Sequence, residues 1–139
     1  IVMDLIREIR PHQIFVAGDL ADPHGTHRVC LNAALAAIDE LNKEGLLDEC
    51  RVWMYRGAWA EWEIDHIEMA VPMSPEQLMN KRKSILRHQS QMESAPFMGK
   101  DERLFWQRSE DRNRATAALY QQLGLASYEA IEAFVEYKF

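Results

Sequence analysis

Two histidines three residues apart, His24 and His27, are the side chains of this sequence whose type and spacing could support chemistry. Both lie in the segment ADPHGTHRVCLNAAL (residues 21–35), where a proline-glycine turn leads into a helical pattern. Neutral imidazole is a common zinc ligand, and a catalytic zinc needs three protein ligands and an open position for water. Asp19 and Asp22 stand close enough in sequence to orient such ligands. The pattern therefore indicates either half of a metal site or an ordinary turn with a helix cap.

A short apolar run precedes the two histidines. Residues 13–17 predict a buried strand, and Thr26 is expected to cap a helix that runs to about Lys43. In a parallel α/β unit, ligands bind where the chain leaves the carboxyl end of a strand and enters a helix. His24 and His27 would lie at that edge, with both rings on one side of the first helical turn.

The remaining apolar patterns predict an α/β fold. They indicate helices over residues 1–10, 74–91 and 109–123, and strands over residues 51–55, 66–71 and 133–139. A strand–helix–strand order with a long first crossover implies parallel pairing. We therefore expect one domain, residues 1–139, with a mostly parallel sheet flanked by helices in three layers. Ile14, Phe15 and Val16 would form a central strand of that sheet.

Composition and charge exclude several classes of function. The 139 residues are 47% hydrophobic and carry a net charge of −6, which leaves no basic face for a nucleic acid. No apolar run approaches the roughly 18 residues that a membrane span needs. Cys30 and Cys50 are expected to be reduced and buried, as in a cytoplasmic protein. The sequence begins at Ile1, inside an amphipathic pattern and without an initiator methionine, so we interpret it as a fragment of a longer chain.

Three further features could contribute to binding. Arg56, next to Gly57 after the second predicted strand, is the best candidate to bind an anionic group of a substrate. The run Lys81–Lys83 is expected to be a solvated helix face. Four aromatic residues could line a sugar-binding mouth, although packing of the strand and loop is the favoured interpretation: Trp53, Tyr55, Trp59 and Trp62.

Three segments resemble the PIG-L/LmbE-like family, zinc-dependent N-deacetylases that act on N-acetylglucosaminyl compounds. Asp22–Val29 (DPHGTHRV) resembles the second motif of that family, a His-Pro-Asp-His-Arg segment that follows a strand. Lys83–Gln91 (KSILRHQSQ) is similar to the family's helix with a His-x-Ser-Gln ending, and Glu132–Phe134 to its final Glu-Ala-Phe strand. The three matches follow the family's order along nearly the whole chain, and they imply an LmbE-like, Rossmann-like fold.

The resemblance also assigns roles to individual residues. His27 matches a zinc ligand, and His24 matches the catalytic histidine that, when protonated, stabilises the oxyanion formed as water attacks the amide. His88 matches a structural position, at a helix end that packs against the core. Gly25 and Thr26 replace the usual Pro-Asp between the histidines, which alters the loop.

The family's first motif, a His-Pro-Asp-Asp run that supplies two more zinc ligands and the general base, is absent from this sequence. We therefore expect a C-terminal fragment whose zinc belongs to the intact parent, and no metal bound by the fragment alone. The sequence of residues 23–30 also resembles the C-terminal part of two-domain bacterial proteins in which a glucosamine-6-phosphate deaminase/isomerase-like domain precedes an LmbE-like one.

The expected partners are an N-acetylglucosamine-type substrate, the upstream domain of the same chain and, through an exposed sheet edge, a second copy in a homodimer. Two alternatives remain open: a non-catalytic scaffold or regulatory module of the fused enzyme, and a stable fragment whose activity belongs to other domains.

Overall fold

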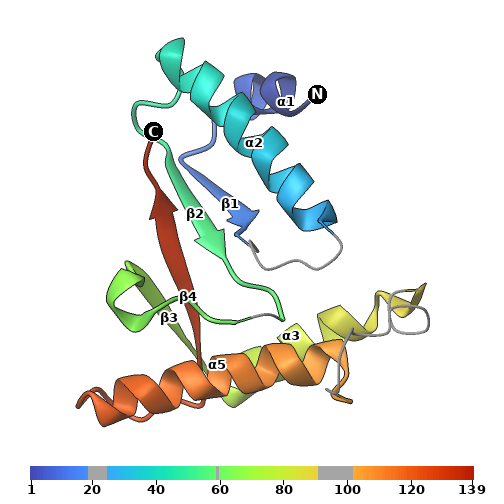
Figure 1. Cartoon of the computed structure of the whole chain (residues 1–139), viewed down its shortest axis with the longest axis vertical. Helices are drawn as coiled ribbons and strands as arrows, with labels where there is room; N and C mark the ends of the chain where they lie inside the picture. The colour runs from blue at the N-terminus through green and yellow to red at the C-terminus, as the bar shows by residue number, and fades with distance from the viewer. Residues whose placement is uncertain (19–24, 59, 91–101) are drawn as a thin grey trace.

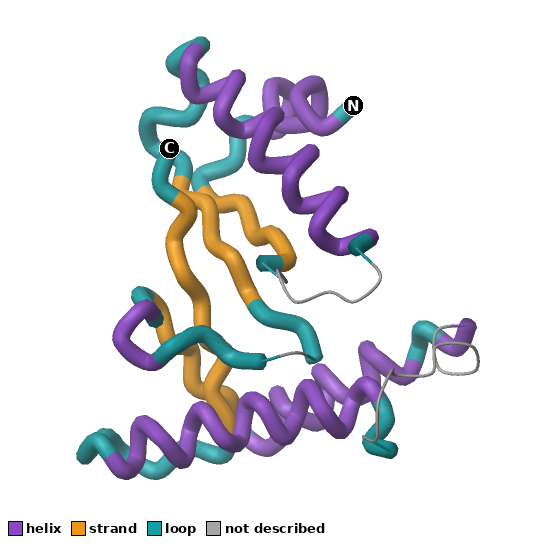
Figure 2. Tube along the Cα trace, viewed as in Figure 1, coloured by secondary structure: helices purple, strands orange, loops and turns teal. Residues whose placement is uncertain are grey.

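The protein is described here by a computed structural model that covers residues 1–18, 25–58, 60–90 and 102–139. It is an α/β protein with a four-stranded mixed sheet in the order β1-β2-β4-β3 (Figure 1). Helices α1 and α2 lie together against β1 and β2, and helices α3 and α5 lie together against β3 and β4 (Figure 2). The carboxyl ends of β1 and β2 point from the first pair of helices toward the second.

The first half of the chain forms the predicted strand–helix–strand unit. Strand β1 spans Gln13–Ala17, helix α2 spans Thr26–Lys43 and strand β2 spans Arg51–Tyr55. β1 and β2 pair in parallel, as expected from the long crossover. The expected cap is wrong by one residue: Gly25 is the N-cap of α2, at a φ of 73° that suits glycine, and no side chain caps the helix.

The second half overturns the prediction of a mostly parallel sheet. β4 (Ala130–Tyr137) inserts between β2 and β3 (Met69–Met73) and runs antiparallel to both. The antiparallel direction follows from the path of the chain: β4 begins after α5 (Phe105–Gln122), and α5 lies near the carboxyl end of β2 (Figure 1). β4 occupies the second side of β2, so β1, predicted to be central, lies at the edge of the sheet.

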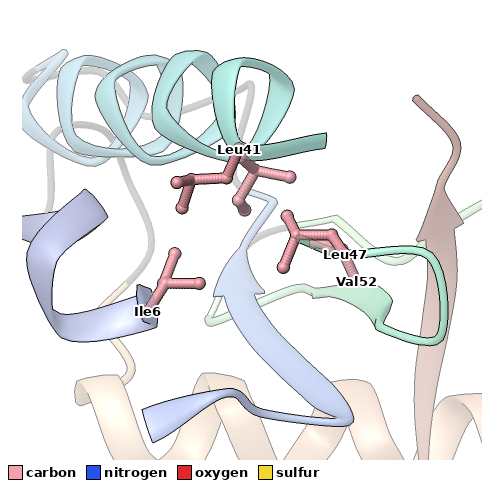
Figure 3. Packing of buried hydrophobic residues seen from close by; sticks show 5 residues of the cluster. Ile6, Leu41, Leu47 and Val52 are labelled. Atoms are coloured by element: carbon pink, nitrogen blue, oxygen red, sulfur yellow. The ribbon is translucent and has the colours of Figure 1, made fainter. Parts of the chain in front are cut away.

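An apolar core holds α1 (Val2–Ile9) and α2 against β1 and β2. Its buried members come from both helices, from β2 and from the turn between α2 and β2: Ile6, Ile38, Leu41, Leu47 and Val52 (Figure 3). Each such side chain contributes about 1.5–3 kcal/mol when fully buried. The predicted helix over residues 1–10 is thereby confirmed, since its face with Ile6 is the one that packs.

Several element boundaries differ from the predicted ones. The third strand begins at Met69 rather than at residue 66, because residues Ile64–His66 form a 3-10 helix, η1. Helix α3 spans Pro75–Leu86 and starts as predicted, with a capping box between Ser74 and Gln77. α5 begins four residues before the predicted position, and β4 three residues before it.

The cysteines and the basic run differ from expectation in their burial. Cys30 is exposed and Cys50 partly exposed; both are free thiols, and burial raises the pKa of Cys50. The run 81–83 is not a solvated face as a whole, because Lys81 contacts Glu132 and Arg82 binds Glu110. Within the described ranges, no helix is long and apolar enough to cross a membrane.

Glu110 of α5 binds two arginines, one from α3 and one from its own helix. Arg82 donates to it at 2.6–2.9 Å, and Arg114 on its own helix donates at 3.0 Å. Burial raises the pKa of Glu110, but the hydrogen bonds and charges of Arg82 and Arg114 together hold that pKa below its usual range. A carboxyl with a lowered pKa stabilises the fold above its unfolded-state pKa of about 4.3 and loses that contribution as the pH falls through its folded-state value.

We therefore expect the free energy of unfolding to fall more steeply between pH 7 and pH 3 in the wild type than in Glu110→Gln. Urea unfolding at a series of pH values measures it. Glu8→Gln, at an exposed position of α1, is the control and should keep the wild-type pH dependence. Equal slopes for all three proteins would contradict the assignment.

Candidate functional site

Three residues meet where β1 and β2 end. Gly18 follows β1, and its N–H donates to the carbonyl oxygen of Tyr55 at 2.7 Å. The Arg56 guanidinium donates from Nη1 to the carbonyl oxygen of Gly18 at 3.3 Å and stacks over Trp62, with 4.0 Å between its central carbon and the ring centre. We call Gly18, Arg56 and Trp62 the edge cluster. It joins the two parallel strands at the edge where α/β proteins bind ligands.

The edge cluster requires glycine at position 18. A Cβ placed there would lie 2.8 Å from Cζ2 of Trp62 and 2.9 Å from Cβ of Met54, closer than packed carbon atoms approach. Trp62 therefore sits directly against the backbone at the end of β1. The predicted preference for packing over sugar stacking holds for Trp53, which is buried with 6% of its surface exposed. Trp59 lies outside the described residues.

The predicted site residues fall in three different situations. His27 occupies the first turn of α2 and is exposed. His24, Asp19 and Asp22 lie outside the described residues. Arg56 is half-buried in the edge cluster, so its guanidinium sits at the predicted edge of the sheet while contacting protein groups. The roles of His27 as a ligand and Arg56 as an anion-binding group stay predictions.

The described residues do not make a zinc site by themselves. In the part of the chain that the structure describes, no three or more His, Cys, Asp or Glu side chains lie close enough together to hold a metal. His27 could offer one imidazole, whereas a catalytic zinc needs three protein ligands. His88, predicted to pack against the core at the end of α3, is exposed instead.

A buried arginine of α5, which sequence reasoning missed, positions the segment after β2. The Arg112 side chain is 5% exposed. Its Nε donates to the carbonyl oxygen of Gly57 at 2.9 Å and its Nη2 to that of Arg56 at 2.8 Å. It also binds the carboxylates of Glu61, at 2.6 Å from Nη1, and Glu132 of β4. Because α5 is rich in charged residues, no signal in the sequence separated this arginine from solvated ones.

A cavity of about 620 Å³ lies between α5 and the segment that follows β2. Its lining includes Glu61, Trp62, Arg112, Thr116 and Leu119. The Thr116 hydroxyl donates to Oε2 of Glu61 at 2.7 Å, which together with Arg112 fixes that carboxylate. Trp62 belongs to both the lining and the edge cluster, so one side chain separates the cavity from the end of β1.

Comparison with known proteins shows that this chain is similar in sequence to part of a longer protein. Over an alignment of 139 positions that covers 99% of its length, it is 76% identical to a curated protein of Bacteroides thetaiotaomicron that carries the provisional name glucosamine-6-phosphate deaminase-like protein. The chain spans 21% of the length of that protein. No family model matches the sequence. The chain is thus similar to about a fifth of a protein named for amino-sugar chemistry.

We expect Arg112→Met to lower the free energy of unfolding by about 3–5 kcal/mol, because the half-buried Glu61 and Glu132 would lose this cation, and Glu132 would keep only its contact with Lys81 among the cations of the described residues. Denaturant unfolding measures it. Arg103→Met, at another arginine of the cavity lining, is the matched control. It breaks a half-exposed pair with Asp111, 2.9 Å long, and should cost at most about 1 kcal/mol. Equal losses in the two variants would contradict the role of Arg112.

Gly18→Ala should destabilise the fold by about 1–3 kcal/mol, because the new methyl group meets Trp62 and Met54. The same substitution in a Trp62→Leu background tests the cause. If the clash with the indole is responsible, the cost of Gly18→Ala falls in that background and the double-mutant cycle shows a coupling energy. Additive effects would argue against the contact.

Proposed function

We propose that this chain is part of a longer cytoplasmic enzyme of amino-sugar metabolism, and that it contributes to the N-deacetylation of an N-acetylglucosamine-type substrate. The observation that carries the proposal is the 76% identity to a protein whose name refers to glucosamine 6-phosphate. The resemblance of residues 22–29, 83–91 and 132–134 to the LmbE-like family supports the reaction type, and an LmbE-like fold is part of the proposal. Free thiols at Cys30 and Cys50 fit a reducing compartment.

Within this proposal the carboxyl ends of β1 and β2 form one side of the active site. His27, exposed at the first turn of α2, offers an imidazole to a metal, and His24 is the catalytic histidine that donates a hydrogen bond to the developing oxyanion. Arg56 binds the substrate at this edge of the sheet. Since the described residues do not fit zinc alone, the proposal assigns the remaining ligands to parts of the protein outside them.

A second candidate is a non-catalytic module that scaffolds or regulates a glucosamine-6-phosphate deaminase/isomerase-like enzyme. One observation favours it: among the residues that the structure places, no three potential ligands come together. The name of the Bacteroides thetaiotaomicron relative also mentions a deaminase and no deacetylase. Zinc analysis of the full-length protein and release of acetate from N-acetylglucosamine compounds separate the two candidates.

In the full-length protein, we expect His27→Ala to remove the metal, whereas His24→Ala keeps the metal and slows turnover by about 10²–10³. A ligand sets metal occupancy, whereas a donor to the oxyanion acts on the transition state. His88→Ala, at an exposed position, is the control and should change neither quantity. Metal analysis and acetate release on the purified variants decide it, and equal zinc loss in the His27 and His24 variants would overturn the assignment.

A further inference from the structure

We propose that the cavity beside α5 binds an uncharged pyranose ring, such as that of N-acetylglucosamine, and does not bind a sugar phosphate. The choice of an amino sugar rests on the proposed function; the preference for an uncharged ring comes from the cavity itself. Its volume of about 620 Å³ lies within the range of about 300–1,000 Å³ that is typical of small-molecule sites.

The charges of the lining balance one another. The lining contains three basic and three acidic side chains: Arg103, Arg108 and Arg112, and Glu61, Glu63 and Asp111. Arg112 binds Glu61 at 2.6 Å and Arg103 binds Asp111 at 2.9 Å. Side chains that bind phosphate are commonly arginine or lysine, whose donors then point at the phosphate oxygens. A cavity lined by equal numbers of acidic and basic side chains, with two of its three arginines held by its own carboxylates, favours a ligand without net charge.

The other lining groups match the two kinds of surface that a pyranose presents. An indole and aliphatic side chains, including Trp62, Ile67 and Leu119, can contact its C–H groups. The Glu61 carboxylate can accept hydroxyl hydrogen bonds. Its Oε2 already accepts from Arg112 and Thr116, whereas Oε1 accepts from the backbone N–H of Trp62 at 3.1 Å, which leaves this oxygen a second lone pair.

The position of the cavity links it to the proposed reaction. Trp62 lines the cavity and also packs against Gly18 and Arg56 of the edge cluster. A ring bound in the cavity would therefore lie one side chain away from the end of β1. The cavity is thus suited to hold the sugar, while the edge of the sheet faces the group that reacts.

Two substitutions at exposed positions of α5 fill the cavity without changing its buried contacts: Leu119→Trp and Ala115→Leu. Leu123→Trp is the matched control, because Leu123 ends the same helix, is 66% exposed and does not line the cavity. Binding of N-acetylglucosamine and of glucosamine 6-phosphate to the full-length proteins is measured by calorimetric titration, and circular dichroism checks that each variant folds. Binding is attributed to this cavity only if a substitution that fills the cavity weakens it.

We expect N-acetylglucosamine to bind the wild type and Leu123→Trp with equal affinity. Its affinity for each filled variant should be lower than for the wild type by about tenfold or more. Glucosamine 6-phosphate should show no binding that depends on the cavity. The proposal is overturned if folded filled variants keep the wild-type affinity for N-acetylglucosamine, if the wild type shows no binding, or if the filled variants lose binding of the phosphate. Acetate release reports separately on the proposed function: cavity-dependent binding without deacetylation supports this inference and contradicts that function.

Discussion

The buried guanidinium of Arg112 is the contact on which the candidate site depends. Burying a charge is costly unless it is paired and hydrogen-bonded, and this side chain donates to two carbonyl oxygens and two carboxylates. Its partner Gly57 lies 55 residues earlier in the sequence. One residue of α5 thereby holds the segment after β2, the Glu61 side of the cavity and β4 through Glu132. A lysine could not replace it, because a single ammonium cannot present donors in four directions from a planar fork.

Both ends of the sheet pack apolar side chains, and one of them adds a set of ion pairs. At one end, α1 and α2 pack an apolar core against β1 and β2, with Ile38 and Leu41 fully buried. At the other end, Leu78, Ala117 and Ile131 are buried as well, and ion pairs also join α3 and α5 to each other and to β4, among them Arg82 with Glu110 and Lys81 with Glu132. Fixed, paired charges of this kind preorganise polar groups around the end where β1 and β2 open into loops. The candidate site therefore lies at the polar end of the molecule.

Polar residues of the second half were the hardest to interpret before the fold was known. Lys81 and Arg82 have the composition of a solvated helix face, yet both contact acids of other elements. Asn113, fully buried, accepts a hydrogen bond from Lys81 and donates one to the carbonyl oxygen of Ile131. Local composition cannot distinguish such a residue from an exposed one, since its partners are far away in sequence. The same limit applies to Cys30, which was expected to be buried and is exposed.

The sequence by itself determined the local elements of the first half: β1 and β2 have the predicted bounds, α2 begins one residue earlier than predicted, and the parallel pairing of the two strands follows from the long crossover. These depend on apolar periodicity, glycine and chain connectivity, all of which act over a few residues or along one connection. Only the tertiary structure decided that β4 enters between β2 and β3 and that β1 lies at the edge. It also decided that Arg112, Glu61 and Trp62 line a cavity beside the end of β1. Such contacts join residues far apart in the sequence, and the free energy that selects them comes from pairing strands and charges in the folded chain, which no local pattern encodes.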